Sequence, residues 1–415
     1  MPGATPDITR RTFRIELARS IPVGILEALM ATFAILFVLR IYRPEGDMEK
    51  VWLLGSSQLG LVASLFIVPL TFRLPLSIPR KMALSGAIAT AFLLVSAVAH
   101  ESLLVFTVCH CLAYFIMMMQ TPLQTQLYQD NYPTENRGFL FGITSIVRGS
   151  STVIFGLIAG MLLAQDLGYY RVLLWIFVAA GATATLALFL TPGKPAEDDG
   201  DRIPLLHSLR WVKEDPAFRR LLVSWMFMGL GNLVALRLWV EYLGNERFGL
   251  NFSEARIAYL TLALPFGCKL LTTFFWGRLF DRINFYLLRA ILNMVFLAAI
   301  LCVYVGGSYP WIFAGVILQG VAFGGGNIVW SLWVTKLAKP EHTSEYMSVH
   351  TFFTGIRGFA APFVGFWILR DFGATALGLF SAVMITIATL IVLPDVRLGK
   401  ARRPATMIEP RGPGV

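Results

Sequence analysis

The sequence predicts an all-α membrane protein with twelve transmembrane helices, arranged as two pseudo-symmetric halves of six. The first observation is composition, because 56% of the 415 residues are hydrophobic, 14% are charged and the mean hydropathy is +0.66. A soluble chain of this length needs more polar surface than this composition supplies, whereas a chain embedded in lipid does not. The other two observations are a series of long apolar segments and a set of motifs that recurs in the second half.

Apolar segments of about 20 residues are long enough to cross a bilayer as helices. Six such segments precede a polar stretch at residues 191–220, and six follow it. The predicted spans are Ile21–Leu39, Val51–Thr71, Met82–Ala99, Leu103–Gln120, Phe139–Ala164, Val172–Leu190, Leu221–Leu243, Ile257–Trp276, Ala290–Gly307, Trp311–Val334, Met347–Leu369 and Thr375–Leu393.

The polar stretch contains prolines and an acidic run, so we expect a cytoplasmic linker with a short helix at Pro204–Lys213. The predicted domains are an N-terminal bundle at residues 1–190, the linker at 191–220, a C-terminal bundle at 221–393 and a cytoplasmic tail at 394–415.

Basic residues are distributed unevenly among the predicted loops. With the N-terminus placed inside, most of the 35 Lys and Arg residues fall in cytoplasmic segments, which predicts that both termini are cytoplasmic. No cleaved signal peptide is expected, since no short apolar core precedes a small-residue cleavage site. The expected location is the bacterial inner membrane, and the expected state is a monomer. The basic residues flank apolar segments and form no face interleaved with aromatic residues, so nucleic-acid binding is not expected despite a net charge of +10.

Two arginines interrupt the apolar spans at matching positions. The pattern Ser/Thr-x-x-Arg-Gly contains Arg148 in the fifth span and, 209 residues later, Arg357 in the eleventh. A charge at that depth costs about 2.5–3.5 kcal/mol on insertion scales, so each arginine should face the protein interior. Two guanidiniums facing one cavity would suit a carboxylate or phosphate substrate. The alternative is that each braces helices through Glu27 or backbone carbonyls.

Two ionisable groups are candidates for binding a coupling ion. Glu27 is a carboxylate well inside the first span, and it either binds a coupling proton or forms a structural ion pair with Arg148. His110 in the fourth span matches Gln319 at the same offset, so we expect the two to share an inward face. The alternative for His110 is a neutral, hydrogen-bonded histidine.

Further polar side chains within the spans complete the predicted substrate site. Lys269 in the eighth span would add a third cation, with snorkelling toward the membrane surface as the alternative. The uncharged candidates are Gln58, Asn232, Gln319 and Asn327. The alternative for each is a helix–helix hydrogen bond, worth roughly 0.6 kcal/mol on average. Arg237 and Glu241, one helical turn apart near the outer end of span seven, are expected to form a surface ion pair.

Two loop motifs connect predicted spans on the cytoplasmic side. A G-x-x-x-D-R motif follows the eighth span and is formed by Gly277, Asp281 and Arg282. A P-x-x-x-R-G motif formed by Pro133 and Arg137 joins the fourth and fifth spans. Together with six plus six spans, a polar linker and matching halves, these motifs resemble the major facilitator superfamily over essentially the whole chain.

The resemblance implies a secondary transporter that works by alternating access around a site near the bilayer midplane. Gly277, Asp281 and Arg282 would then form a conformational gate that locks neighbouring helices. Because cations outnumber carboxylates among the candidates, the expected substrate is a small organic anion or zwitterion, coupled to H⁺ or Na⁺. The alternatives are a proton-coupled exporter of a cationic or amphipathic compound, and a non-transporting sensor or assembly protein with the same fold.

An enzyme is not expected. The sequence lacks the phosphate-loop pattern G-x-x-x-x-G-K-[ST], the metalloprotease pattern H-E-x-x-H and the nucleophile pattern G-x-S-x-G. The four cysteines all fall within apolar runs, which favours free buried thiols over disulfides or a metal site. No cofactor and no metal are therefore predicted.

Overall fold

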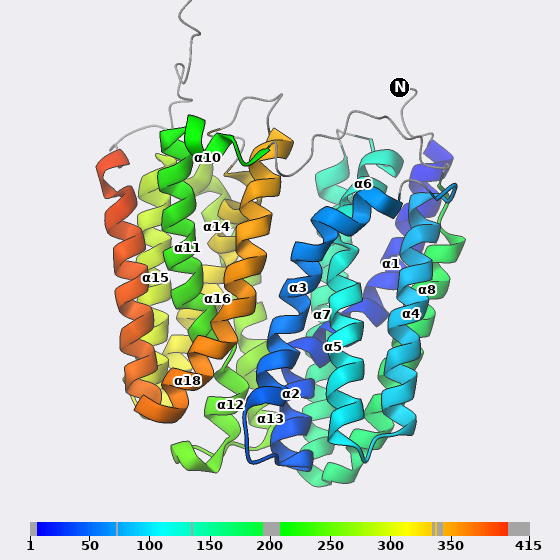
Figure 1. The fold of residues 1–415 in the computed structure, drawn as a ribbon, viewed down its shortest axis with the longest axis horizontal. Coiled ribbons are helices and arrows are strands. Elements are labelled where there is room, and N and C mark those ends of the chain that lie inside the picture. The colour runs from blue at the N-terminus through cyan, green and yellow to red at the C-terminus, as the bar shows by residue number, and fades with distance from the viewer. Residues whose placement is uncertain are drawn as a thin grey trace, which may run out of the picture. The chain divides into compact units, whose positions relative to one another are not determined.

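Long helices make up the computed structural model of the protein, which describes residues 6–71, 74–133, 136–193, 208–333, 337 and 343–396 (Figure 1). The α-helices are α1 (Pro6–Ala28), α2 (Ala34–Phe37), α3 (Met48–Thr71), α4 (Ile78–Val98), α5 (Leu103–Met119), α6 (Thr121–Asn131), α7 (Arg137–Gln165), α8 (Tyr170–Leu190), α10 (Trp211–Glu214), α11 (Pro216–Leu236), α12 (Trp239–Gly244), α13 (Glu254–Ala258), α14 (Leu264–Arg282), α15 (Phe285–Tyr304), α16 (Tyr309–Leu332) and α18 (Thr343–Val392). By length and hydropathy, ten helical segments within the described residues are able to cross a membrane.

Two features account for the difference between these ten segments and the twelve predicted spans. The second predicted span lies in α3, a 24-residue helix outside the ten. The eleventh and twelfth predicted spans both lie in α18, where two helices meet at Gly373. The φ of Gly373 is 83°, a left-handed conformation that glycine adopts without steric strain.

The helix boundaries follow the apolar segments of the sequence. The span predicted at Leu103–Gln120 is α5 (Leu103–Met119), and the one predicted at Val172–Leu190 is α8 (Tyr170–Leu190). A helix satisfies its own backbone N–H and C=O groups, which is the requirement that a hydrocarbon environment imposes on such segments. The helix predicted at Pro204–Lys213 lies largely outside the described residues, and the four-residue α10 overlaps its end.

The first and eighth predicted spans contain π-helical turns. They occupy Leu29–Phe33 and Val38–Tyr42 on either side of α2, and Tyr259–Ala263 between α13 and α14. Two of these turns meet through their threonines, since the Thr32 and Thr261 hydroxyl oxygens are 3.0 Å apart. Thr261 already donates to the carbonyl oxygen of Ile257, so Thr32 is the donor between them. Such turns occur frequently at functional sites, which directs attention to this part of the chain.

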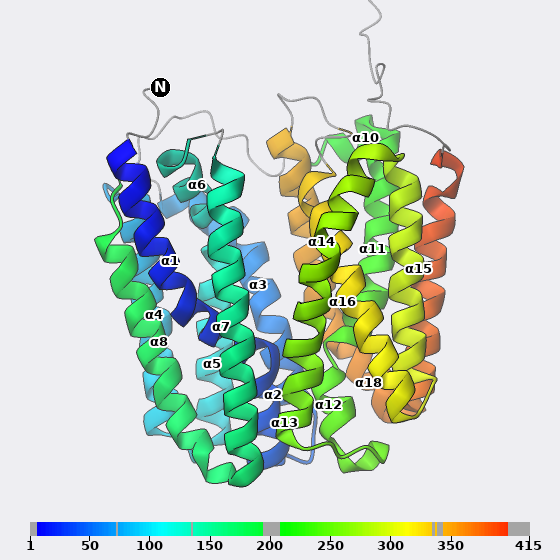
Figure 2. The ribbon, with the colours of Figure 1, turned by 180° about the vertical axis from the view of Figure 1, so that it is seen from behind.

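The chain divides into two compact units. Unit 1 comprises Met1–Arg202, Leu233–Phe266 and Thr351–Leu377, and unit 2 comprises Ile203–Asn232, Gly267–His350 and Gly378–Val415. Within unit 1, α1 packs along α7, α3 along α5, and α4 along α8 (Figures 1 and 2). Within unit 2, α15 packs along α16.

Glycines allow several helices of unit 1 to approach closely. A Cβ on Gly60 in α3 would collide with the carbonyl oxygen of Phe115 in α5. On α7, a Cβ on Gly160 would lie 2.7 Å from the Cβ of Ala258. Small residues at such crossings bring backbones into van der Waals contact, which is a main source of association between helices in membranes.

We predict that Gly60→Ala lowers the thermal stability of the detergent-purified protein, because the new methyl group must displace the backbone of α5. Overpacking of this kind destabilises by about 1–3 kcal/mol. The matched control is Gly142→Ala on α7, where a Cβ has no atom within 4 Å. Equal melting temperatures for the two variants would contradict the close packing of α3 on α5.

Candidate functional site

The predicted charges Glu27 and Arg148 form an ion pair between α1 and α7. Arg148 Nε lies 3.3 Å from Glu27 Oε1. Gly24 permits this approach, because a Cβ there would collide with the carbonyl oxygen of Arg148. The Thr152 hydroxyl lies 3.0 Å from the carbonyl oxygen of Gly24 and 3.5 Å from Glu27 Oε2. The structure therefore brings together the acid and one of the two repeated arginines.

This ion pair is only partly buried. The Arg148 side chain is 34% exposed and the Glu27 side chain is 44% exposed. Ion pairs with this much exposure contribute little net stability, typically about 0–1 kcal/mol in water. The pair is therefore weak enough for another charged group to compete for either partner.

The second repeated arginine, Arg357, has a different environment. It lies in α18 and is buried, with 6% exposure. The predicted site residue Gln58 packs against the next residue along α18, since a Cβ on Gly358 would be 2.5 Å from Gln58 Oε1. Trp52 of α3 packs against the ring of Phe359, with ring centroids 5.8 Å apart. Arg357 and Gln58 are thus held where α3 packs against α18.

A buried lysine, Lys50, lies at the start of α3, at the predicted outer end of unit 1. Its Nζ is 2.8 Å from Glu241 Oε2 and 2.7 Å from Asp47 Oδ1. Lys50 and Glu241 are 5% and 2% exposed, so both charges are desolvated. Asn245 completes the group by donating from Nδ2 to Glu241 Oε1 at 2.7 Å.

These contacts show that the predicted surface pair of Arg237 and Glu241 is wrong. The prediction assumed one continuous helix, in which residues four apart face the same side. In the structure α11 ends at Leu236 and α12 begins at Trp239, so the helical register is broken between the two residues. Glu241 is buried against Lys50 instead of lying on the surface.

Another ion pair lies near that of Lys50 and Glu241. Arg40, in the π-helical turn Val38–Tyr42, places its Nε 2.9 Å from Glu254 Oε1 at the start of α13. A guanidinium Nη of Arg40 also donates to the carbonyl oxygen of Phe252 at 2.9 Å. The two side chains are 11% and 13% exposed. We call Arg40, Lys50, Glu241 and Glu254 the ion-pair cluster.

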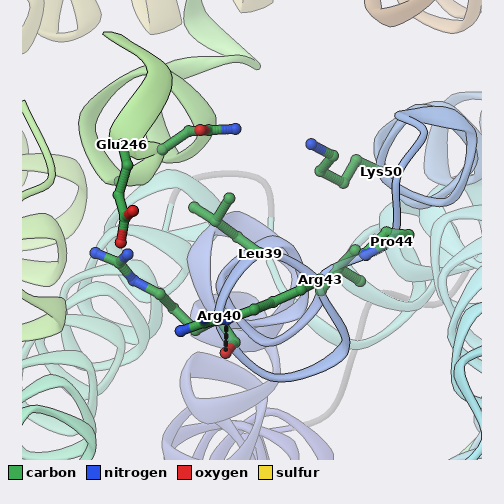
Figure 3. Close-up of a pocket in the computed structure, with 9 residues that line it drawn as sticks. Leu39, Arg40, Arg43, Pro44, Lys50 and Glu246 are labelled. Carbon is green, nitrogen blue, oxygen red and sulfur yellow. Dashed lines mark hydrogen bonds between the residues drawn. The ribbon is translucent and has the colours of Figure 1, made fainter. Parts of the chain in front are cut away.

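A cavity of about 210 Å³ lies beside the ion-pair cluster (Figure 3). Arg40, Arg43 and Lys50 line it, and the carboxylate of Glu246 points toward Arg40 from the opposite side (Figure 3). Arg43 has a left-handed backbone with φ of 46°, which is uncommon for a residue with a side chain. Its Nε donates to the carbonyl oxygen of Arg40 at 3.0 Å. Strain at a cavity rim motivates a functional hypothesis for this region.

His110 and Gln319 are both fully buried. The Nδ1 atom of His110 lies 2.8 Å from the carbonyl oxygen of Phe106 and 3.2 Å from the hydroxyl of Ser96 in α4. Gln319 lies in α16 of unit 2, and its side-chain amide has no hydrogen-bond partner within the described residues. Their proposed roles at a substrate site remain predictions.

The remaining candidate residues belong to unit 2. Lys269 on α14 and Asn232 on α11 are partly exposed, and Asn327 on α16 is exposed. Gly277, Asp281 and Arg282 lie on the last turns of α14, so the whole G-x-x-x-D-R motif is helical and the expected loop begins only after it. Neither Asp281 nor Arg282 makes an ion pair with another residue in the part of the chain that is described, and both side chains are exposed.

Sequence reasoning missed most of the ion-pair cluster. Arg40, Lys50 and Glu254 fall at the ends of predicted spans, where charged residues are ordinary and give no individual signal. Only the charges taken together give a signal, because basic residues follow the first span while acidic residues flank the loop after the seventh. Their opposite signs are consistent with pairing between these two segments. Also unforeseen is the enclosure of His350 by Trp225, Trp330 and Trp333, with ring centroids 4.9, 6.0 and 5.3 Å away.

Comparison with known proteins defines the class. The Major Facilitator Superfamily model matches residues 52–284 and 245–409. Comparison with the curated proteins gives no match. Among solved structures, the nucleoside transporter NupG superposes with a TM-score of 0.72 at 13% identity, covering 94% of this chain and 98% of that one. The human organic anion transporter MFSD10 gives 0.64 at 16% identity, covering 94% and 100%. A bacterial homologue of the human lysosomal transporter Spinster gives 0.59 at 16% identity, covering 95% and 96%.

The fold and the family model together define a multi-pass membrane protein of a transporter class. The chain belongs to the major facilitator superfamily. The resemblance inferred from the loop motifs and the span pattern is therefore confirmed, and family membership indicates a transporter and not an enzyme.

We predict that Lys50→Met destabilises the protein strongly, because Glu241 then stays buried without its ammonium partner. Breaking a buried ion pair by removing one partner typically costs about 3–5 kcal/mol. The double variant Lys50→Met with Glu241→Met should be more stable than Lys50→Met alone, since it removes both charges. Thermal unfolding in detergent measures this coupling. Arg237→Gln is the control and should change the melting temperature little. A loss of stability equal to that of Lys50→Met would instead support the pairing of Arg237 with Glu241.

Proposed function

We propose that the protein is a secondary transporter that moves a small organic anion or zwitterion by alternating access, coupled to H⁺ or Na⁺. It would have twelve spans in two six-helix halves at residues 1–190 and 221–393. Residues 191–220 would form the cytoplasmic linker, and both termini, including a tail at 394–415, would be cytoplasmic. The protein would act as a monomer in a bacterial inner membrane.

Family membership supports transport, and the charges support the substrate class. Solved relatives of the fold include a nucleoside transporter and an organic anion transporter, which supports a small organic solute in general terms. Fold alone does not select among solutes, so the choice rests on side chains. Arg148, Arg357 and Lys269 outnumber Glu27 among the candidate residues, which favours a substrate with an anionic group.

The observation that carries the proposal is the partly exposed ion pair of Glu27 with Arg148. A substrate carboxylate or phosphate would compete with Glu27 for the Arg148 guanidinium, which binds either in a planar, two-pronged geometry. A bound proton removes the charge of Glu27 and so weakens its hold on Arg148. Proton binding and anion binding would therefore favour each other, which is the linkage that a proton–anion symporter needs.

The same pair accommodates sodium as the coupling ion. A Na⁺ ion held by the Glu27 carboxylate would screen it from Arg148 and release the guanidinium in a similar way. Arg357 and Gln58 would provide a second polar contact, and Lys269, Asn232, Gln319 and Asn327 would complete the site. A gradient of one ion applied without the other distinguishes H⁺ from Na⁺.

Alternating access also requires contacts that form at one end and break. The ion-pair cluster joins residues of the first predicted half, Arg40 and Lys50, to Glu254 and Glu241 of the second. Opening the outer end would require both pairs to separate and their charges to become hydrated. Gly277, Asp281 and Arg282 would serve the corresponding role at the cytoplasmic end.

We predict that replacing both Arg148 and Arg357 by Gln abolishes uptake of organic anions into proteoliposomes. Removing one charge-assisted contact typically weakens binding by about 1.5–3 kcal/mol, so either single variant should raise the KM by roughly 10-fold or more. Size-exclusion profiles and melting temperatures establish that the variants fold. Unchanged uptake kinetics in a folded double variant would refute the anion site.

We predict that Glu27→Gln removes the pH dependence of uptake and lowers the KM for the anion at neutral pH. The substitution mimics the protonated acid, so Arg148 is available at every pH. In the unmodified protein, an inward proton gradient should stimulate uptake if Glu27 carries the coupled proton. Initial rates measured between pH 5 and pH 8 give the comparison. Retention of the normal pH profile in Glu27→Gln would place coupling at another residue.

If the protein is instead an exporter of cations, the same variants should have opposite effects on substrate affinity. With Glu27 as the recognition charge, Glu27→Gln would abolish transport, while Arg148→Gln would free the carboxylate and increase the affinity for a cation. The two variants assayed with one anionic and one cationic substrate panel therefore separate the two functions.

A further inference from the structure

A groove runs between α1 and α8 in unit 1, with a volume of about 450 Å³. The two helices lie side by side over this length (Figure 2). The lining side chains are Ala18, Arg19, Ile21, Pro22, Ile25, Ile176, Ala179, Ala180, Thr183 and Ala187. Small residues on α8 form much of one wall, and apart from Arg19 and Thr183 the lining side chains are apolar.

Two arginines extend the α1 wall of the groove beyond its end. Arg11 and Arg14 precede Ala18 by seven and four residues, so they lie on the same face of α1. Both side chains are exposed. Arg11 also reaches across to α8, where a guanidinium Nη lies 3.5 Å from the carbonyl oxygen of Leu190. The basic pair is therefore at the end where α1 begins and α8 ends.

These two charges are not neutralised within the described residues. No ion pair joins Arg11 or Arg14 to a described carboxylate, although Asp7 precedes Arg11 by one turn. Arg19, which lines the groove, differs because it holds Glu16 through two hydrogen bonds of 2.7 and 2.9 Å. A molecule bound in the groove would therefore contact apolar side chains along its length and two guanidiniums at one end.

We infer that the groove between α1 and α8 binds an anionic phospholipid of the cytoplasmic leaflet. One acyl chain lies against Ile21, Ile25 and Ala179, and the headgroup phosphate is held by Arg11 and Arg14. From Arg14 to Ile25 the helix rises about 16 Å, which matches a headgroup above the upper part of one chain. The positive end is on the predicted cytoplasmic side, where anionic lipids attract basic residues.

The choice of a phospholipid over a soluble anion follows from the combination of features. A free phosphate or a carboxylate would use the arginines but gain nothing from the groove. A zwitterionic phospholipid would use the groove but gain less from the arginines, because its own ammonium group offsets the charge of its phosphate. An anionic phospholipid uses both, and it is present at the surface where the pair is predicted to lie.

The test measures binding of phosphatidylglycerol and phosphatidylcholine with identical acyl chains to the delipidated, detergent-purified protein by native mass spectrometry. Each basic residue near an anionic lipid contributes about fivefold in affinity, so Arg11→Gln with Arg14→Gln should weaken phosphatidylglycerol binding about 25-fold. Phosphatidylcholine binding should weaken much less, because its choline ammonium offsets the charge of the same phosphate. Arg80→Gln, an exposed arginine at the start of α4, is the matched charge control and should bind normally.

A second pair of variants tests the apolar groove separately from the two arginines. Ala179→Leu fills the groove and should weaken binding of both lipids, while Ala182→Leu, exposed on α8 but outside the groove, should leave both unchanged. Equal affinity for the two lipids in the unmodified protein would overturn the inference. So would displacement of phosphatidylglycerol by an equal concentration of glycerol 3-phosphate, or normal lipid binding by Ala179→Leu.

Discussion

The pairing of charges within an apolar chain is the constraint on which the rest of this structure depends. A charge in hydrocarbon is expensive, so each one must be matched by an opposite charge or by exposed polar surface. Lys50 with Glu241 and Arg40 with Glu254 satisfy this requirement by mutual burial. Glu27 with Arg148 satisfies it only in part, since both side chains keep a third or more of their surface exposed.

This difference in burial separates structural from exchangeable charges. The ion-pair cluster is desolvated and short, with Lys50 Nζ 2.8 Å from Glu241 Oε2, so separating it requires a change of conformation. The pair of Glu27 and Arg148 is longer, at 3.3 Å, and partly exposed, which is why the proposed substrate site is placed there. In the proposed transport cycle, the buried pairs would hold one state of the protein and the partly exposed pair would bind the substrate.

The internal repeat produces equivalent positions but not equivalent environments. Arg148 and Arg357 occupy the same place in the repeated motif, yet Arg148 is partly exposed beside α1, while Arg357 is buried in α18 next to Gly358, which packs against Gln58 of α3. The environment of each arginine follows from the helix that packs nearby. Gly24 allows α1 to pack closely against α7, and Gly358 allows α18 to pack closely against α3. The two repeated arginines therefore differ in burial although the motif around them is the same.

The sequence by itself determined the helices, the family and the charged residues inside the spans. Hydropathy determined the positions of the helices, because a helix in lipid must be apolar along most of its length. The agreement of α5 and α8 with the predicted spans illustrates this. The sequence also offered Glu27 as a partner for Arg148, although it left that pairing open against proton binding. Only the tertiary structure decided that Glu241 pairs with Lys50 and not with Arg237, and that Arg40 pairs with Glu254. Those partners are distant in sequence, and their meeting depends on helix breaks and π-helical turns, whose register no periodic pattern encodes.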